Sequence, residues 1–201
     1  IRHAGYGTMA VESIGAPGTV HKDGPAGISS TLAGGNLHCM AYEPAVVLAS
    51  TYNVELASRR GKLVGEDSLS SGVQVWYAPA MNIHRAANSG RNFEYFSEDP
   101  YLAGKCSANI INGVQSKGIG TSLKHFACNS QEAYRMVINE VIDERAMREI
   151  YLTAFEIAIK EAQPWTVMNS YNRINGVYAS QNGWLQQQVA RGEWGFQGLF
   201  V

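Results

Sequence analysis

Charged and aromatic side chains lie at or beyond the ends of several short apolar segments in this sequence. They are a carboxylate, a guanidinium, an ammonium with an imidazole beside it, and a phenol: Asp23, Arg91, Lys124, His125 and Tyr171. A carboxylate accepts hydrogen bonds from two adjacent hydroxyl groups, while Lys and Arg donate to hydroxyl oxygens. A phenol ring can cover the apolar face of a pyranose. This combination of groups indicates a binding site for a sugar.

Most of these side chains also have a purely structural explanation. Asp23 precedes Gly24 and Pro25, so it could serve only as a turn former. A lone histidine such as His125 is more often a hydrogen-bonded core residue than a ligand-binding one. Lys124 is harder to explain in this way, because an ammonium group in an apolar segment costs free energy unless a partner or a ligand meets it.

The segment at residues 90–100 is rich in charge. It combines Arg91 with the acids Glu94, Glu98 and Asp99 and with aromatic rings, and it shows neither a strand period nor a helix period. The pattern predicts an ordered loop, where binding residues concentrate. A salt-bridged surface turn is the alternative.

The composition limits the kinds of partner to consider. The chain has 201 residues, 45% hydrophobic and 16% charged, with a formal net charge of −1, which is ordinary for a globular domain with one sizeable core. The balanced charge gives no electrostatic footprint for nucleic acid or anionic lipid. The sequence contains no apolar run of about 18 residues, so we predict no membrane-spanning helix. The sequence starts at Ile1 without a methionine or a signal-like segment, so localisation stays open between cytoplasmic and secreted.

No metal or cofactor is expected. The histidines show no ligand spacing. The three cysteines, Cys39, Cys106 and Cys128, are an odd number with wide spacings, which predicts reduced and mostly buried thiols.

Short apolar segments alternate with longer helical patterns along the chain. We predict strands at residues 19–21, 73–78, 119–123, 165–168 and 198–201, which lack clean alternation, as strands buried on both faces do. We predict helices at 44–60, at 100–117 with Asp99 as N-cap and Pro100 at the first position, after Asp143, and at 180–190 with Ser180 as cap. The apolar stripe of the helix after Asp143 predicts core packing.

This alternation implies a parallel sheet, either doubly wound or closed into a barrel. A nucleotide-binding doubly wound domain should show a glycine-rich turn after its first strand, and the glycines here lack that spacing. A barrel gathers the residues that follow its strands at one mouth. We therefore predict an α/β fold of the (β/α)8 TIM-like barrel type, incomplete, with about five strand–helix units over residues 1–201.

Several motifs, in this order, resemble those of the barrel domain of glycoside hydrolase family 3 β-glucosidases. The resemblance extends from about Gly15 to Val201. Its carriers are Asp23-Gly24-Pro25-Ala26-Gly27, Asn82-Ile83-His84-Arg85, Gly90-Arg91-Asn92-Phe93-Glu94, Ser97-Glu98-Asp99-Pro100, Lys124-His125-Phe126 with Asn129 to Glu132, Asp143-Glu144-Arg145, Tyr171-Asn172-Arg173-Ile174-Asn175-Gly176 and Gly195-Phe196-Gln197-Gly198.

The resemblance implies a retaining β-glucosidase that removes terminal non-reducing β-D-glucosyl residues from β-glucosides or cello-oligosaccharides. Asp23 would accept hydrogen bonds from the hydroxyls at the non-reducing end of the glucose in the −1 subsite. Arg91, Lys124 and His125 would bind the same ring. Arg135 and Tyr171 would lie close to the nucleophile. Met168 would line the apolar side of the pocket.

Neither reacting carboxylate is matched in this sequence. The nucleophilic aspartate is expected just after Val201, and the acid/base glutamate in a separate α/β sandwich domain. Retaining hydrolysis needs two carboxyl groups about 5 Å apart. Residues 1–201 alone are therefore expected to be inactive, and to need the remainder of the same polypeptide or a second fragment. The resemblance makes Glu94 a loop-ordering partner and Asp99 a helix cap, and it leaves a homo-oligomer open.

Alternatives remain within and beyond the family. Members acting on N-acetylglucosamine carry a histidine and an aspartate shortly after the lysine–histidine pair, and residues 126–132 lack both. Asp23 suits glucose better than xylose, which leaves β-xylosidase specificity as an alternative. A barrel that binds carbohydrate without hydrolysing it is another. An unrelated barrel enzyme acting on phosphorylated substrates would need a late glycine-rich anion loop, which this sequence lacks.

Overall fold

A curled, mostly parallel sheet forms the centre of the structure, a computed structural model that describes residues 7–29 and 39–201. The strand order is β1-β2-β3-β4-β6-β9, and β1 alone pairs antiparallel with its neighbour. The strands are β1 (Gly7–Thr8), β2 (Thr19–Asp23), β3 (Val75–Tyr77), β4 (Gly120–Phe126), β6 (Thr166–Asn169) and β9 (Leu199–Phe200). All five predicted strands are present, as parallel neighbours in this sheet.

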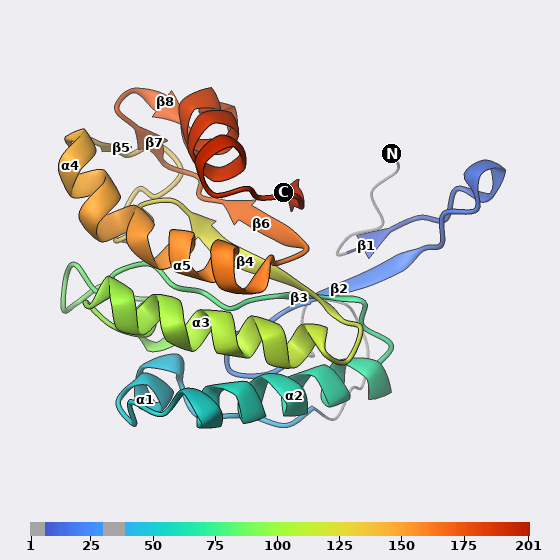
Figure 1. Cartoon of the computed structure of the whole chain (residues 1–201). Coiled ribbons are helices and arrows are strands. Elements are labelled where there is room, and N and C mark those ends of the chain that lie inside the picture. Colours follow the sequence, from blue (N-terminus) through green and yellow to red (C-terminus); the bar gives the residue numbers. More distant parts are fainter. Residues whose placement is uncertain (1–6, 30–38) are drawn as a thin grey trace.

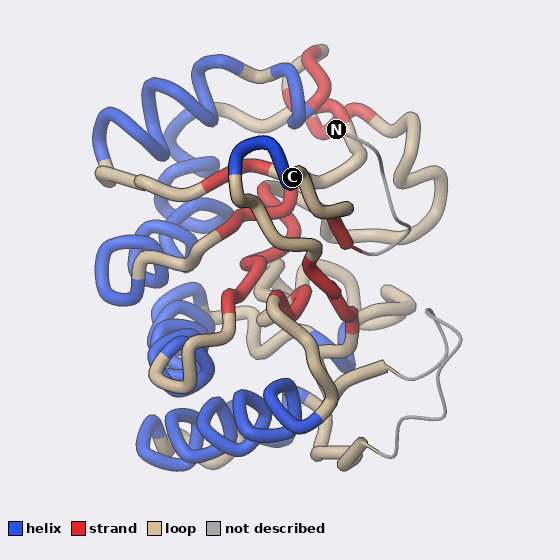
Figure 2. The backbone as a smooth tube through the Cα atoms, turned by 90° about the vertical axis from the view of Figure 1, so that its right-hand side faces the viewer, coloured by secondary structure: helices blue, strands red, loops and turns tan. Residues whose placement is uncertain are grey.

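Helices cover one side of this sheet, as in a segment of a barrel wall (Figure 1). Figure 2 shows the helices together on one side of the strands and most of the connecting loops on the other. The main helices are α2 (Val54–Ser70), α3 (Pro100–Gln115), α5 (Thr153–Ala162) and the π-type helix η6 (Trp184–Glu193). Shorter elements are η1 (Glu12–Ile14), α1 (Ala45–Ala49), η3 (Asn92–Glu94), α4 (Glu144–Ala146), η4 (Met147–Leu152), η5 (Ala179–Gln181), and a small sheet of β5 (Asn139–Glu140), β7 (Arg173–Ile174) and β8 (Val177–Tyr178).

Two predicted helix starts are confirmed by their caps. The Asp99 carboxylate accepts hydrogen bonds from the backbone N–H groups of Tyr101 and Leu102, and Pro100 begins α3. Asp143 accepts from the N–H of Ala146 at the start of α4. These carboxylates satisfy donors that have no partner within the helix.

Two predicted helices were wrong in their bounds. Residues 44–60 form two helices, because the chain takes a left-handed turn at Tyr52 (φ 52°) and Asn53 caps a new helix by accepting from Leu56 N–H. Residues 180–190 begin with the 3-10 turn η5, and η6 starts only after it. Asn182, rather than the predicted Ser180, accepts from the N–H of Leu185.

The strand predicted at 119–123 is longer than expected. β4 continues to Phe126, and all seven of its residues are buried. Lys124 and His125 therefore lie within the strand rather than after it. Phe126 anchors this end in the core, with its ring 5.1 Å from that of Phe155 and stacked at 6.0 Å on that of Phe200.

Helices α2 and α3 pack with their backbones almost touching. Gly61 of α2 and Gly113 of α3 face each other, so that a Cβ at Gly113 would lie 2.5 Å from the carbonyl oxygen of Ser58 and 2.9 Å from the Cα of Gly61. Only the absence of side chains at these positions permits the approach. Since α2 leads into β3 and α3 into β4, this contact fixes the spacing of the strands that carry the site.

Substitution of Gly113 tests the close approach. Gly113→Ala is expected to lower the free energy of unfolding by about 1–3 kcal/mol through overpacking, although alanine favours a helix more than glycine does. Gly183→Ala is the matched control, because nothing lies within 4 Å of a Cβ there, and it is expected to be neutral or slightly stabilising. Urea unfolding of both variants measures the difference, and equal stabilities would contradict the proposed contact.

Candidate functional site

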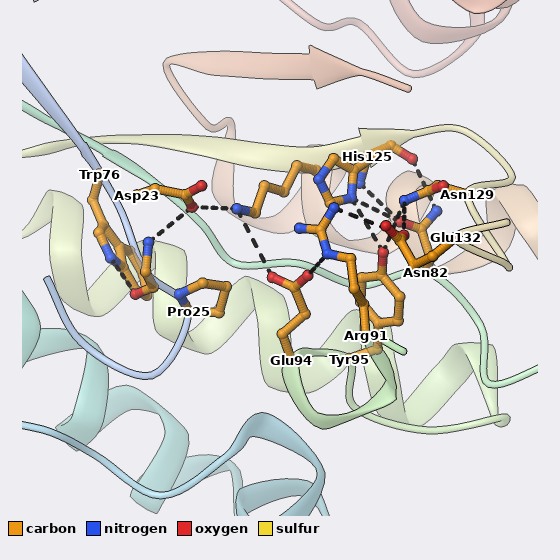
Figure 3. A network of polar contacts seen from close by, with 12 residues as sticks. Asp23, Pro25, Trp76, Asn82, Arg91, Glu94, Tyr95, His125, Asn129 and Glu132 are labelled. Atoms are coloured by element: carbon orange, nitrogen blue, oxygen red, sulfur yellow. Dashed lines mark hydrogen bonds and ion pairs between the residues drawn. The ribbon is translucent and has the colours of Figure 1, made fainter. Parts of the chain in front are cut away.

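Six charged side chains of alternating sign form one continuous series at the carboxyl ends of the strands. We call this series the ion-pair chain, and its members in spatial order are Asp23, Lys124, Glu94, Arg91, Glu132 and Arg135. Figure 3 shows Asp23, Glu94, Arg91 and Glu132 lying close together although they come from three separate segments. Three acids and three cations leave the series with no net formal charge.

The pair between Asp23 and Lys124 joins β2 to β4 across the intervening β3. Lys124 Nζ donates to Asp23 Oδ1, and only 2% of the lysine side chain is exposed. The backbone N–H of Gly24 donates to the same oxygen at 2.8 Å. No described residue donates to the other oxygen, Oδ2, and a third of the aspartate side chain remains exposed. The buried lysine thus has the partner that its position requires, and the aspartate keeps one oxygen for a ligand.

Glu94 lies between two cations. Arg91 Nε donates to Glu94 Oε1, and the other glutamate oxygen lies 3.9 Å from Lys124 Nζ. Burial alone would lower the pKa of Arg91, but the hydrogen bond from Arg91 and the charge of Glu94 outweigh it and raise that pKa. Glu94 is itself buried. Its two oxygens connect Arg91 in the 90–100 loop to Lys124 in β4.

Glu132 continues the series beyond Arg91. Its Oε1 lies 3.9 Å from Arg91 Nη1, and its Oε2 accepts from Arg135 Nη1 at 2.8 Å. The Arg135 guanidinium in turn lies over the Tyr171 ring, 5.5 Å from its centroid, a cation–π distance. This end of the ion-pair chain therefore connects the loop after β4 to the residue that follows β6.

His125 is held by hydrogen-bonding groups on one side of its ring. Nδ1 lies 3.3 Å from both Tyr95 Oη and Asn82 Oδ1, and Asn82 also bonds both backbone groups of His125. Burial, followed by the charges of Lys124, Arg91 and Arg135, holds the pKa of His125 well below its ordinary value. The imidazole is therefore neutral near pH 7, and no described residue bonds its Nε2.

A cavity of about 450 Å³ opens beside Asp23 and Arg91. Its wall includes the Asp23–Ser29 loop, and two bonds hold that loop: Arg60 Nη2 donates to Pro25 O at 2.6 Å, and Trp76 Nε1 donates to Gly24 O at 2.9 Å. Gly24 has φ 123°, where a Cβ would lie 1.9 Å from Gly27 O. The loop that lines the cavity is therefore held in one conformation.

The seven residues predicted for the site all lie in or beside the ion-pair chain. Four are members of it, His125 follows the member Lys124 in β4, and Tyr171 contacts Arg135. Met168 lies opposite Lys124 in the β4–β6 register and is half-buried. The cavity itself is lined by only two of the seven, Asp23 and Arg91.

Several residues that build the site were not predicted as site residues, although Asn82 and the segment from Asn129 to Glu132 were named among the family motifs. Asn82, Tyr95 and Asn129 are buried and hydrogen-bonded around His125, and Glu132 bridges two arginines. Their common signal is a polar side chain in the loops after β3 and β4. Tyr95 offered less of a signal, because a tyrosine in an aromatic segment is also a normal core residue.

All three cysteines are free, with Cys106 and Cys128 buried and Cys39 partly so. Within residues 7–29 and 39–201, no group of three or more His, Cys, Asp or Glu side chains is arranged to hold a metal ion. None of the helices described is long and apolar enough to cross a membrane.

The neutral state of His125 predicts a pH dependence of stability. The unfolded chain binds a proton at this histidine below about pH 6.5, whereas the folded protein does not, so stability falls as the pH drops below that value. One such group contributes a slope of up to about 1.4 kcal/mol per pH unit. His125→Gln is expected to remove this part of the slope, as measured by urea unfolding between about pH 5 and about pH 7. A slope unchanged by the substitution would show that the folded imidazole titrates as it does in the unfolded chain.

Known proteins share this chain's sequence and fold. An exo-α-(1→6)-L-arabinopyranosidase of Bifidobacterium breve is 48% identical over 96% of the chain, and a β-glucosidase of Rhizobium radiobacter is 44% identical over 96%. The solved structure of β-glucosidase 3B from Thermotoga neapolitana in complex with glucose is 47% identical over 97% of the chain, with a TM-score of 0.92. The chain spans about a quarter of the length of these relatives: 27%, 24% and 28% respectively.

The family model described as the glycosyl hydrolase family 3 N-terminal domain matches residues 6–201. This match covers the strands, the helix layer and every member of the ion-pair chain. The chain therefore belongs to the N-terminal domains of glycosyl hydrolase family 3.

Proposed function

We propose that this chain forms the sugar-binding part of a retaining glycoside hydrolase that removes terminal non-reducing β-D-glucosyl residues. In this proposal, residues 1–201 are part of a (β/α)8 barrel with about five strand–helix units. Further polypeptide completes the barrel and supplies an α/β sandwich domain. The substrate is a β-glucoside or a cello-oligosaccharide.

The ion-pair chain is the observation that carries the proposal. Its cations and acids hold one another in place, yet Asp23 Oδ2, Arg91 Nη2 and His125 Nε2 have no hydrogen-bond partner among the described residues. These atoms can accept from and donate to the hydroxyls of a pyranose ring. Because the charges balance, the site suits a neutral sugar, and the fixed partners reduce the reorganisation needed on binding.

The acids of the ion-pair chain position the sugar in this mechanism and do not react with it. Glu94 and Glu132 are each engaged by a guanidinium, so their oxygens are already used in contacts within the site. Retaining hydrolysis needs one carboxylate to attack the anomeric carbon and one acid to protonate the leaving oxygen, about 5 Å apart. We assign both groups to polypeptide beyond this chain, the nucleophile to an aspartate shortly after β9.

In this mechanism Arg135 and Tyr171 lie next to the nucleophile, and Met168 lines the apolar side of the ring. The guanidinium over the phenol ring fixes both side chains near the end of β6, close to the edge strand β9. A nucleophile that follows β9 would therefore come within reach of them. Arg91, Lys124 and His125 bind the ring from the β3 and β4 side.

A second substrate is favoured by one comparison. Relatives named exo-α-(1→6)-L-arabinopyranosidase are 48% identical to this chain, slightly more than the 44% of the β-glucosidase from Rhizobium radiobacter. An arabinopyranose ring lacks the hydroxymethyl group of glucose. Asp23 could accept hydrogen bonds from adjacent hydroxyls of either ring, so L-arabinopyranosides are the second candidate substrates.

The full translation product of the gene that contains this chain is the protein to test. It is expected to hydrolyse aryl β-D-glucopyranosides faster than aryl β-D-xylopyranosides or α-L-arabinopyranosides. Asp23→Asn is expected to lower kcat/KM on the order of 100-fold or more, because a hydrogen-bond acceptor for sugar hydroxyls is lost and the buried Lys124 loses its charged partner. Asp67→Asn is the control, because Asp67 bonds Tyr42 outside the site.

The possible results separate the alternatives. Binding of glucose without hydrolysis by the full product would favour a carbohydrate-binding barrel. A preference for xylosides or arabinopyranosides would replace the glucosidase assignment. Absence of both binding and hydrolysis with all three sugars would refute the proposed function.

A further inference from the structure

Glu132 contacts several residues of the proposed sugar site, although it is not one of the residues that the sequence resemblance assigns to sugar binding. Its carboxylate contacts Arg135 through Oε2, at 2.8 Å, and approaches Arg91 through Oε1, at 3.9 Å. These two arginines come from different loops, after β4 and after β3. One carboxylate therefore sets the separation of two guanidinium groups that would otherwise repel each other.

A second connection runs from Glu132 to His125. Asn129 Nδ2 donates both to Glu132 Oε1, at 3.2 Å, and to Tyr95 Oη, at 3.1 Å. Tyr95 Oη lies 3.3 Å from His125 Nδ1. Burial raises the pKa of Tyr95 well above its ordinary value, so the phenol stays protonated and bonded. Figure 3 shows Glu132, Asn129, Tyr95 and His125 in one connected group.

The Glu132 side chain is partly shielded from solvent, which strengthens its contacts with charged groups. About a quarter of its side chain is exposed, compared with two thirds for Glu144, which forms a 2.8 Å pair with Arg148 on the outer helices. Charges partly removed from water interact more strongly than fully hydrated ones. The adjacent Gln131 is exposed and bonds only the carbonyl of Ala133. The arrangement is therefore specific to Glu132 and not a general property of the loop.

We infer that Glu132 is a positioning residue of the site, orienting Arg135 and Arg91 directly and His125 through Asn129 and Tyr95. The inference rests on the proposed function, since it supposes that these three side chains bind the sugar. Glu132 does not itself touch the sugar. The carboxylate acts by holding the three groups in one arrangement before the sugar enters, and displacement of such groups by about 1 Å can cost on the order of 100-fold in rate.

The test uses the full translation product and an aryl β-glucoside. Glu132→Gln keeps the shape of the side chain and removes its charge, and it is expected to lower kcat/KM on the order of 10- to 100-fold. Glu144→Gln is the matched control, because it removes the same charge from an arginine pair outside the site, and it is expected to leave kcat/KM unchanged. Thermal unfolding of both variants checks that neither has lost its fold.

A double-mutant cycle with Arg135→Met separates positioning from a merely structural role. Because Glu132 also orients Arg91 and His125, the double variant is expected to be more impaired than Arg135→Met alone, but by less than the product of the two single effects. If the two effects multiply, or if Glu132→Gln keeps wild-type kcat/KM, the inference is wrong while the proposed function stands. Wild-type protein that neither hydrolyses nor binds any of the glycosides would overturn the function itself, and this inference with it.

Discussion

Lys124 lies in a strand whose residues are all buried, and its ammonium group cannot be hydrated there. Moving such a charge out of water costs several kcal/mol even after relaxation, and the loss of a partner from a buried pair costs about 3–5 kcal/mol. The carboxylate of Asp23 meets this requirement from the end of β2, and Glu94 approaches from the loop after β3. Much of the site geometry follows from this one requirement.

Each acid that neutralises a cation is in turn held by the next element. Glu94 needs Arg91, which is drawn toward Glu132, and Glu132 binds Arg135 beside Tyr171. The helix layer supports this arrangement from behind, because the glycine contact between α2 and α3 keeps the strands that carry these loops at a fixed spacing. The ion pairs between the loops and the close backbone packing of α2 on α3 thus both hold the site residues in place.

The sequence predicted the strands better than the helix bounds. Apolar and β-branched segments marked all five parallel strands, but β4 runs on through Lys124 and His125, because partners in other segments satisfy their polar groups. The break at Tyr52 carried no glycine or proline signal, and Asn53 acts as a cap only because the chain turns there. Charged residues near strand ends indicated a common mouth, and the structure places the residues named from the family motifs near one another.

The parts of the site that could not be predicted depend on contacts between loops. Nothing in the local sequence shows that Glu132 reaches arginines in two segments, or that Asn82 bonds both backbone groups of His125. The sequence predicts that Lys124 has a partner, but it does not show which acid that partner is. Such pairings are set by sheet order and strand register, which are properties of the whole fold.

The Asp23–Lys124 bond joins residues 101 positions apart in the chain, and this separation has a consequence for the order of folding. A contact of such long range repays the entropy of loop closure only after the intervening strand and helices have assembled. Partly folded forms, in which β2 has not yet docked beside β3, would leave Lys124 without the Asp23 carboxylate. The series of ion pairs at this edge of the sheet would then be complete only after β2 has paired with β3.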